Sequence, residues 1–343
     1  MKRPSLRSMF RTRSARAAAR GVRPDVALPF DMFDEARTAR QLGTSKKLAN
    51  LYHKGQKKAW NGRELLATLT ERHGGVKIAP DKKEAIAELF AVILWGELAA
   101  WKVSADLALQ LEPMEAKLAA TAQAHDEARH FYVMHDYLEL LLGEVPKQLN
   151  PEAERVLEGT LKADSLTKQL LGMQMMIEPM ALTIFQIVRE QRIEPVLADL
   201  LEFYERDEAR HVALGVLHLP KLLTGMTIPE AIDLWSWQFR QFWAEVALVR
   251  SLEPALLELG IDPRQVIEVG RNKQVRANLM LLDELGTDHR VLPLFMRFFD
   301  AKCEWEFPTK CDRRDLRARL AGAFAAALEG DMDVPMNLTN VAA

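Results

Sequence analysis

The sequence predicts an all-α protein, with a four-helix bundle at its centre and a helical extension at its C-terminal end. Apolar positions recur at helical spacing over long segments, and prolines stand where the first turn of a helix tolerates them. Strand-like alternation bounded by turn residues is scarce anywhere in the 343 residues. With 48% hydrophobic and 27% charged residues, the chain can bury a large core, which argues against a disordered or fibrous protein.

The first 25 residues form a basic segment that we expect to be a flexible tail. Residues 1–24 carry eight Lys or Arg and no acid, whereas the rest of the chain is net acidic. The segment lacks the apolar run of a secretory signal, although an organelle transit peptide has a similar Arg- and Ser-rich composition. Cys303 and Cys311 are too few for a disulfide framework, so a cytoplasmic location is the default expectation.

A lead-in segment over 26–79 precedes the bundle, which we assign to residues 80–224. Prolines at or just before the first turns and Gly143, which suits a left-handed helix end, delimit its helices. Links this short predict that helices adjacent in sequence run antiparallel. The four expected ranges are 80–111, 113–143, 152–191 with an interruption near 163–165, and 195–223.

Residues 225–330 are expected to form further helices that pack on the bundle, and 331–343 a flexible tail. Pro254, Pro263 and Pro293 are the expected helix breaks in this extension. The expected helical ranges are 228–259, 263–285, 290–302 and 312–328.

The bundle contains a repeated set of glutamates and histidines. A lone Glu is followed thirty residues later by Glu-x-x-His, and the whole pattern recurs after eighty-one residues. Each Glu-x-x-His lies inside the same five letters, Asp-Glu-Ala-Arg-His, at 126–130 and 207–211. One helical turn separates this Glu from its His, so both side chains can reach one metal centre. The six candidate ligands are Glu97, Glu127, His130, Glu178, Glu208 and His211.

Both lone glutamates lie in apolar surroundings. Glu97 is the only charged residue in 89–101, and Glu178 is the only one in 170–188. An unpaired buried carboxylate costs several kcal/mol, so such a group becomes neutral, finds a cation or binds a metal. If the repeated residues were incidental surface charges, two acids isolated in apolar runs would remain unexplained. The negative charges of four glutamates also balance the positive charges of two divalent cations. The doubled pattern therefore predicts a buried two-metal site.

This ligand set resembles that of the ferritin-like di-iron carboxylate proteins, over about residues 80–224. The group includes ribonucleotide reductase small subunits, ligand-binding oxidases related to them, acyl-carrier desaturases, arylamine N-oxygenases and aldehyde-deformylating oxygenases. The segment 51–60 also looks like the stretch before the first ligand helix in several members. Manganese could replace iron in one position. By this resemblance, one iron would be held by Glu97, Glu127 and His130 and the other by Glu178, Glu208 and His211, with one or two glutamates bridging.

The resemblance also implies an acceptor for the second N–H of each histidine, which fixes the orientation of a metal-bound imidazole. In the resembling families an Asp serves the histidine of the other half of the site. We therefore expect Asp126 to pair with His211, and Asp207 with His130.

Other polar residues lie within one turn of the expected ligands. Arg129 and Arg210 would either neutralise the two aspartates or be exposed. Gln174, Tyr204 and Glu205 are the candidates for proton delivery.

Pro179 directly follows a ligand and removes the backbone donor to the carbonyl of Met175. A kink or local widening of the helix at Glu178 is therefore expected, either as room for substrate or oxygen or as a tolerated bend. A Met-rich stripe is more often adaptable core than cavity lining. The residues that would line any cavity are Met173, Met175, Met176, Met180, Leu94, Trp101, Phe131 and Met134.

Departures from individual families narrow the chemistry. Met134 stands where reductase small subunits carry a radical Tyr, and Tyr204 stands where arylamine N-oxygenases carry an extra His. Thr183 is out of register with the Thr that desaturases place after the third Glu. Two cysteines cannot supply the four-Cys iron site of rubrerythrin-type peroxidases.

The resemblance implies an O2-dependent di-iron oxidase or oxygenase that hydroxylates, desaturates, N-oxygenates or cleaves an organic, apolar small substrate. A separate reductase or ferredoxin would supply electrons, because no nucleotide motif or cluster-binding cysteines are evident. The alternatives are a ferroxidase-type iron-handling protein, a ligand-binding Mn/Fe oxidase without oxygenase turnover, and a non-enzymatic helical scaffold. No nucleic-acid partner is expected, and polar residues interrupt the one run, 170–188, that could be taken for a membrane span. Spare helical faces leave a homodimer open.

Overall fold

The computed structural model describes residues 35–145, 148–286 and 292–329. The two tails expected at 1–25 and 331–343 lie outside these ranges. The secondary structure of all three ranges is helical, without a strand in any of them, as the sequence predicts.

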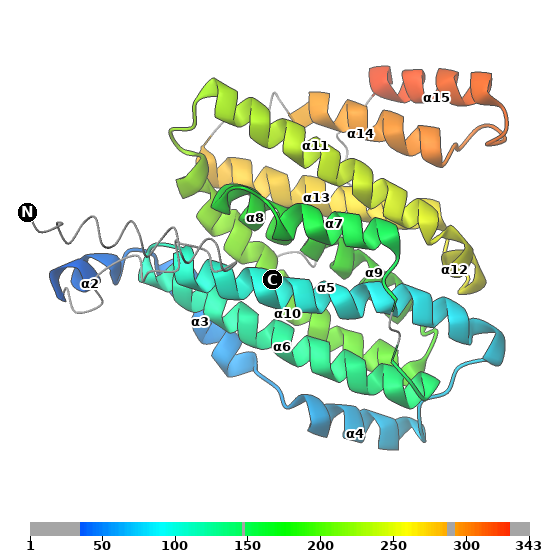
Figure 1. Ribbon diagram of the computed structural model, residues 1–343, viewed down its shortest axis with the longest axis horizontal. Coiled ribbons are helices and arrows are strands. Elements are labelled where there is room, and N and C mark those ends of the chain that lie inside the picture. Colours follow the sequence, from blue (N-terminus) through cyan, green and yellow to red (C-terminus); the bar gives the residue numbers. More distant parts are fainter. Residues whose placement is uncertain (1–34, 146–147, 287–291, 330–343) are drawn as a thin grey trace, which may run out of the picture.

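Four long helical units form the central bundle (Figure 1). A 3₁₀ turn, Pro80–Lys82, leads directly into the first unit, which begins at Lys83. A shorter helix, α7 (Pro151–Leu161), precedes the third unit, which begins at Leu166. The interruption expected near 163–165 is present, because α7 ends at Leu161 and the next helix begins at Leu166. The units are α5 (Lys83–Gln110), α6 (Met114–Leu142), the continuous α8 (Leu166–Gly172), η2 (Met173–Ile177) and α9 (Glu178–Gln191), and α10 (Pro195–Leu223).

Local sequence explains where these helices begin and end. Gly143 closes α6 in the left-handed conformation with φ of 81°, which costs glycine little. The side chains of Asn150 and Ser165 accept hydrogen bonds from first-turn N–H groups of α7 and α8. The carboxylate of Glu194 does the same for α10, accepting from the N–H of Leu197 at 2.7 Å.

The α6 and α9 helices run parallel, so the expectation that sequence neighbours are antiparallel is wrong for this pair. Gln123, one turn before Glu127 on α6, accepts a hydrogen bond from Gln174, one turn before Glu178, at 2.9 Å. In an antiparallel pair these two glutamines would lie on opposite sides of the glutamates. Between α6 and α8 the chain forms α7. This helix brings the chain back to the end of the bundle at which α6 begins, and α8 starts there. The pairs α5–α6 and α9–α10 have short links and are antiparallel as expected.

Within the described residues before the bundle, from Glu35 onward, the structure has three α-helices, although the sequence indicated only a lead-in segment there. The α3 helix packs on α6 and α10, and α4 also contacts both of these helices. The link between α3 and α4 therefore lies against the middle of the bundle and places Trp60 there. The helices are α2 (Glu35–Gln41), α3 (Lys46–Lys58) and α4 (Gly62–His73).

The described part of the chain after the bundle, 224–286 and 292–329, contains five helices. The expected range 228–259 is divided at Leu252, two residues before Pro254. The α13 helix packs on α9 and α10, and α11 packs on α7. Figure 1 shows α14 and α15 at the edge of the molecule that lies furthest from α4. The helices are α11 (Ile228–Ser251), α12 (Glu253–Glu258), α13 (Pro263–Leu285), α14 (Leu292–Glu306) and α15 (Leu316–Glu329).

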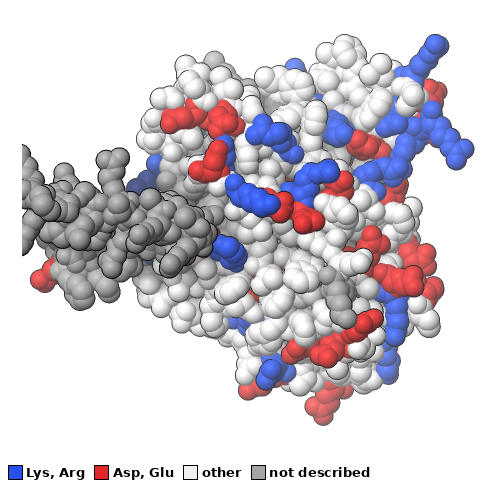
Figure 2. Space-filling model, viewed as in Figure 1, with Lys and Arg blue, Asp and Glu red and all other residues white. Residues whose placement is uncertain are grey.

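The third unit of the bundle is a core helix. In the described ranges, Leu166–Gln191 is the one helical unit long and apolar enough to cross a membrane, but 78% of its most apolar window is buried inside the protein. Acidic and basic side chains are interspersed over most of the face seen in Figure 2, and basic side chains gather at its upper right.

Candidate metal centre

The structure brings all six predicted ligands together at the centre of the bundle. They fall into two groups of four side chains, and within each group the ligand atoms lie within 4.8 Å of one another. Glu127 and Glu208 belong to both groups, which suits bridging carboxylates. None of the six residues is more than 5% exposed. The groups are Glu97, Glu127, His130 and Glu208, and Glu127, Glu178, Glu208 and His211.

Both histidines turn the same ring nitrogen toward the carboxylates. Nδ1 of His130 lies 3.0 Å from an oxygen of Glu208, and Nδ1 of His211 lies 3.0 Å from an oxygen of Glu127. Each histidine thus contacts the Glu-x-x-His glutamate of the other helix, and Nδ1 of His211 also lies 2.5 Å from Glu208 on its own helix. Nδ1 is therefore the nitrogen available to a metal in both halves.

The opposite ring nitrogens face the two aspartates. Nε2 of His130 lies 3.3 Å from Asp207, and Nε2 of His211 lies 3.4 Å from Asp126. Each aspartate serves the histidine of the other half, as the resemblance implied. A carboxylate in this position fixes both the tautomer and the orientation of the ring.

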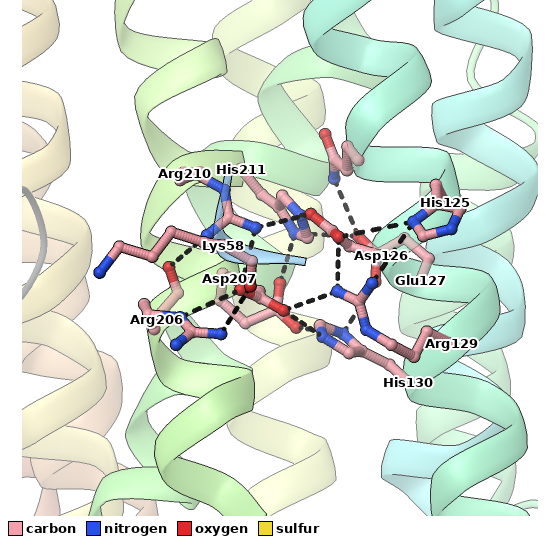
Figure 3. A network of polar contacts seen from close by, with 12 residues as sticks. Lys58, His125, Asp126, Glu127, Arg129, His130, Arg206, Asp207, Arg210 and His211 are labelled. Carbon is pink, nitrogen blue, oxygen red and sulfur yellow. Dashed lines mark hydrogen bonds and ion pairs between the residues drawn. The ribbon is translucent and has the colours of Figure 1, made fainter. Parts of the chain in front are cut away.

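The two arginines of the repeated motif each contact both aspartates (Figure 3). Arg129 Nη2 lies 2.5 Å from Asp126 and 2.8 Å from Asp207. Arg210 Nη2 lies 2.8 Å from Asp126 and 2.9 Å from Asp207. Of the two alternatives for these arginines, the structure places them as neutralising partners. The His130 hydrogen bond and the Arg210 charge outweigh burial and hold the pKa of Asp207 below its usual range.

Trp60 belongs to this network and was not identified from the sequence. Its indole N–H donates to Asp207 at 2.7 Å, and its ring stacks on His130 with centroids 6.2 Å apart. The Arg129 guanidinium lies 4.6 Å from the Trp60 ring centroid. The resemblance of the segment 51–60 was the only signal for it, because 147 residues separate Trp60 from Asp207.

Gln123 is a second missed residue. Its amide nitrogen donates to Glu127 at 3.0 Å and to Glu178 at 2.9 Å. Its amide oxygen accepts from Gln174, which is completely buried. The two glutamines therefore hold two ligand carboxylates in place from one side. The sequence did contain a signal for Gln123, because it stands one helical turn before the candidate ligand Glu127. Gln174 was selected as a site residue for the same reason, since it stands one turn before Glu178.

The three candidates for proton delivery have different places. Tyr204 is completely buried, stacks on His130 at 4.2 Å and donates its hydroxyl hydrogen to the His130 carbonyl at 2.7 Å. Burial raises the pKa of Tyr204 well above its usual value, so it remains a phenol. Gln174 acts on the ligands through Gln123. Glu205 instead accepts from Arg189 at 2.8 Å, in a cleft between α9, α10 and α13.

The helix widening expected at Glu178 is confirmed. The five residues before it form a π-helical turn, in which the N–H of Glu178 bonds to the carbonyl of Met173. Pro179 has no N–H to continue the α-helical pattern toward Met175. On the facing helix, a Cβ at Gly215 would lie 2.5 Å from the Gln174 Cβ, so this turn packs closely against α10.

An apolar cavity adjoins the centre. Glu97 and Glu178 are the only charged side chains in its lining. The methionine stripe is core, as expected. Of the residues that would line a cavity, only Met180 does so, and Trp101 is 45% exposed. Helices α5, α7, α9, α11, α12 and α13 contribute aliphatic side chains, among them Ile93, Val156, Ile184, Val249, Leu252 and Val266.

Burial and the neighbouring charges shift the pKa values of the four carboxyl groups in different directions. Burial raises the pKa of Glu97 well above its usual value, and burial together with Glu208 and Glu127 does the same for Glu178. The pKa values of Glu127 and Glu208 are lowered despite burial, because the histidines lie beside them. The pKa values of both histidines are raised well above 6.5, because the glutamates outweigh the effect of burial.

The donor set fits two divalent metal ions. Oε2 of Glu127 and Nδ1 of His130 are inaccessible to water and make no hydrogen bond of good geometry in the described chain, although carboxylate oxygens lie near Nδ1. Buried polar atoms normally make such a bond, so these two are available as ligands. Ferritin-like two-metal proteins have the same arrangement of ligands: two helices each supply one Glu, and the other two each supply a Glu-x-x-His. The cluster can therefore bind two metal ions.

Comparisons with known proteins give the following. No family model matches the chain, and no curated protein matches its sequence. Solved structures of three mutants of an R2-like ligand-binding oxidase with an aerobically reconstituted Mn/Fe cofactor are similar, with 16%, 18% and 16% identity and TM-scores of 0.42, 0.44 and 0.42. The matches cover 70%, 70% and 82% of this chain and 90%, 90% and 92% of those chains. The assignment of the site therefore rests on its own geometry.

Proposed function

We propose that the protein is an O2-dependent di-iron oxidoreductase that oxidises an apolar organic small molecule. The observation that supports this proposal most directly is the aliphatic cavity that ends at Glu97 and Glu178. These two glutamates belong to different metal groups, so a molecule in the cavity would lie beside both halves of the centre. Pockets for organic ligands are mostly apolar with a few placed polar groups.

The residues of the chain hold the centre and keep it dry. When bound, two iron ions, or one iron and one manganese, would supply the activation of dioxygen. Asp126 and Asp207 orient the histidines, and Gln123 holds Glu127 and Glu178. The aliphatic lining excludes water from the substrate side. Electrons would come from a separate reductase or ferredoxin.

The apolar cavity also favours this proposal over an iron-handling ferroxidase. A ferroxidase needs a polar route for ferrous ions and has no use for an aliphatic cavity at its metal ligands. A scaffold without metal is disfavoured by six polar ligands that converge in a core, because burying them uncompensated is costly.

Anaerobic loading with ferrous ion followed by exposure to oxygen tests the proposal. The expected result is two irons per chain and rapid oxygen uptake, both lost in Glu97→Ala and Glu178→Ala. Glu88→Ala is the matched control, because Glu88 is exposed on the same helix as Glu97. Fewer than two bound irons, or oxygen uptake that survives loss of Glu97, would sink the proposal.

A variant that fills the cavity separates oxygenase from ferroxidase chemistry. Gly96 lines the cavity, and its Cβ position has no atom within 4 Å. Gly96→Leu should keep both irons and their reaction with oxygen, but lose oxidation of apolar substrates found in a screen of the wild-type enzyme. If no apolar compound increases oxygen turnover in the wild type, the result would favour the ferroxidase alternative.

A further inference from the structure

The π-helical turn Met173–Ile177 carries two groups to the metal centre. Gln174 lies inside the turn and bonds to Gln123, and Glu178 is the first residue after it. A π-helical turn is rare and interrupts the regular hydrogen-bond pattern of an α-helix. This turn packs on α10 at Gly215. The position of both groups also depends on what else holds the turn.

Helices α11 and α13 hold the turn through two side chains. Gln274 of α13 donates one amide hydrogen to Glu245 of α11 at 2.8 Å and the other to the backbone carbonyl of Met176 at 3.4 Å. An amide nitrogen has two hydrogens, so both bonds form at once. The shorter bond fixes the amide in the orientation that reaches the turn. A side chain from the C-terminal extension thus bonds to the backbone two residues before the ligand Glu178.

Glu245 is a buried acid that suits this place in its neutral form. It is 5% exposed, and burial raises its pKa to about 8, so most of it carries a proton at pH 7. The proton belongs on Oε1, because Oε2 already accepts from Gln274. In the described ranges, Oε1 of Glu245 and Oε1 of Gln241 have no hydrogen-bond partner. Gln241 stands one turn earlier on the same face of α11, so the acid can donate to it.

Stability alone does not account for a carboxyl group at position 245. An apolar side chain of similar size would avoid the cost of burying a polar one. The acid does what an apolar side chain cannot, because it accepts a hydrogen bond from Gln274 and so orients the amide that reaches Met176. Its role is therefore to be sought at the π-helical turn.

We propose that Glu245 and Gln274 are positioning residues of the metal centre, which hold the π-helical turn in the shape that directs Glu178 and Gln174 toward the metals. The inference rests on the proposed function, because it assigns these residues a part in forming the same centre. Helices α11 and α13 thereby contribute to metal binding without supplying a ligand.

The pair lies close to the apolar cavity. Leu248 and Val249 follow Glu245 by one turn of α11 and line the cavity, as does Ile177, which follows Met176 in the turn. Glu97 belongs to α5, whereas the turn leads directly into Glu178. The effect of the pair should therefore fall on the ion that Glu178 binds.

Amide hydrogen exchange of the metal-free protein measures the hold on the turn directly. Gln274→Met and Glu245→Met keep an unbranched side chain and remove the polar atoms, whereas Glu245→Gln keeps an acceptor for Gln274 and a donor for Gln241. Peptides covering 173–181 should exchange about 2–10-fold faster in the two Met variants, as loss of a hydrogen bond predicts, and no faster than the wild type in Glu245→Gln.

The matched control is Gln265→Met, an exposed change on the same helix as Gln274, which should leave the turn unchanged. Unchanged exchange of the turn in Gln274→Met and Glu245→Met would overturn the inference. So would an increase of the same size throughout α6, because it would show a general loss of stability. Fast exchange in Glu245→Gln would also contradict it, because that variant keeps both hydrogen bonds.

Anaerobic titration with ferrous ion tests the consequence for the centre. One of the two ions should bind about 10-fold more weakly in Gln274→Met and Glu245→Met, with the other ion unaffected. Glu245→Gln and Gln265→Met should bind both ions as the wild type does. Unchanged affinities in the Met variants, or equal weakening of both ions, would refute a positioning role. A wild type that binds fewer than two irons would refute the proposed function, and exchange of the metal-free turn would still decide whether the pair holds it.

Discussion

Trp60 donates its indole N–H to Asp207, the carboxylate that orients His130. Trp60→Phe removes this donor and keeps a ring in contact with Arg129. Loss of a hydrogen bond behind a metal ligand typically weakens metal binding by about 10–100-fold. We expect a loss near the lower limit and confined to one of the two ions, measured by anaerobic ferrous titration. Trp101→Phe, a change on the exposed side of α5, should leave both affinities unchanged; equal affinities in the two variants would refute the role of Trp60.

Glu245 is a third isolated glutamate, distant in sequence from the metal ligands. It is the only charged residue between Arg240 and Arg250, and it is 5% exposed with one hydrogen bond, from Gln274 at 2.8 Å. Burial raises its pKa to about 8. Isolation of a charge in an apolar run therefore predicts burial, and the second motif, Glu-x-x-His, is needed to predict a metal.

The raised pKa of Glu245 has a consequence for stability. Between pH 4.5 and about 8 the unfolded chain releases this proton and the folded protein keeps it, so the free energy of unfolding falls as pH rises through this range. Glu245→Gln removes this dependence. At pH 8 it should stabilise the protein by at most about 5 kcal/mol, and near pH 4.5 it should have little effect. Denaturant unfolding at both pH values checks this, with the exposed Glu88→Gln as control; equal effects at the two pH values would contradict it.

At the scale of elements, prolines, glycines and apolar spacing were enough to predict the helices from α5 to α13 within a few residues, and Pro179 predicted the π-helical turn. Two features depended on tertiary structure. The α3 and α4 helices are short and polar, and packing on α6 and α10 supports them more than their own sequence does. The parallel direction of α9 depends on how α7 crosses the bundle, which spacing does not reveal.

The close contact between α10 and the π-helical turn gives a paired prediction. Gly215→Ala places a Cβ 2.5 Å from the Gln174 Cβ, so a helix must shift. Overpacking of this kind costs about 1–3 kcal/mol, and the better helix propensity of alanine offsets about 1 of that. We expect a net loss of up to about 2 kcal/mol in denaturant unfolding. Gly96→Ala, which meets no atom within 4 Å, should instead stabilise by up to about 1 kcal/mol; equal effects of the two changes would show that packing at Gly215 is looser.

At the scale of the whole molecule, metal binding and folding are coupled, because the ligands come from four separate helical units. The six candidate ligands could be chosen from their spacing and from the isolation of two glutamates in apolar runs, since each half of the set is local to two helices. Their supporting residues could not, because Trp60 and Gln123 meet the ligands only after the helices have packed. A metal that binds only the folded protein stabilises it by about 2.7 kcal/mol at a hundred times its dissociation constant.

This coupling should carry protons with it. The pKa values of Glu97, Glu178 and both histidines are raised, the first two by burial and the histidines by the neighbouring glutamates, so the metal-free centre favours protons on these groups. A metal ion must displace those protons, and its affinity should therefore rise with pH. Calorimetric titration with ferrous ion under anaerobic conditions, in two buffers with different ionisation enthalpies, counts the protons released. We expect release of at least one proton per metal at pH 7 and less in Glu97→Gln, whose amide has no proton to release; binding heats that are the same in both buffers would contradict the charge distribution in the metal centre.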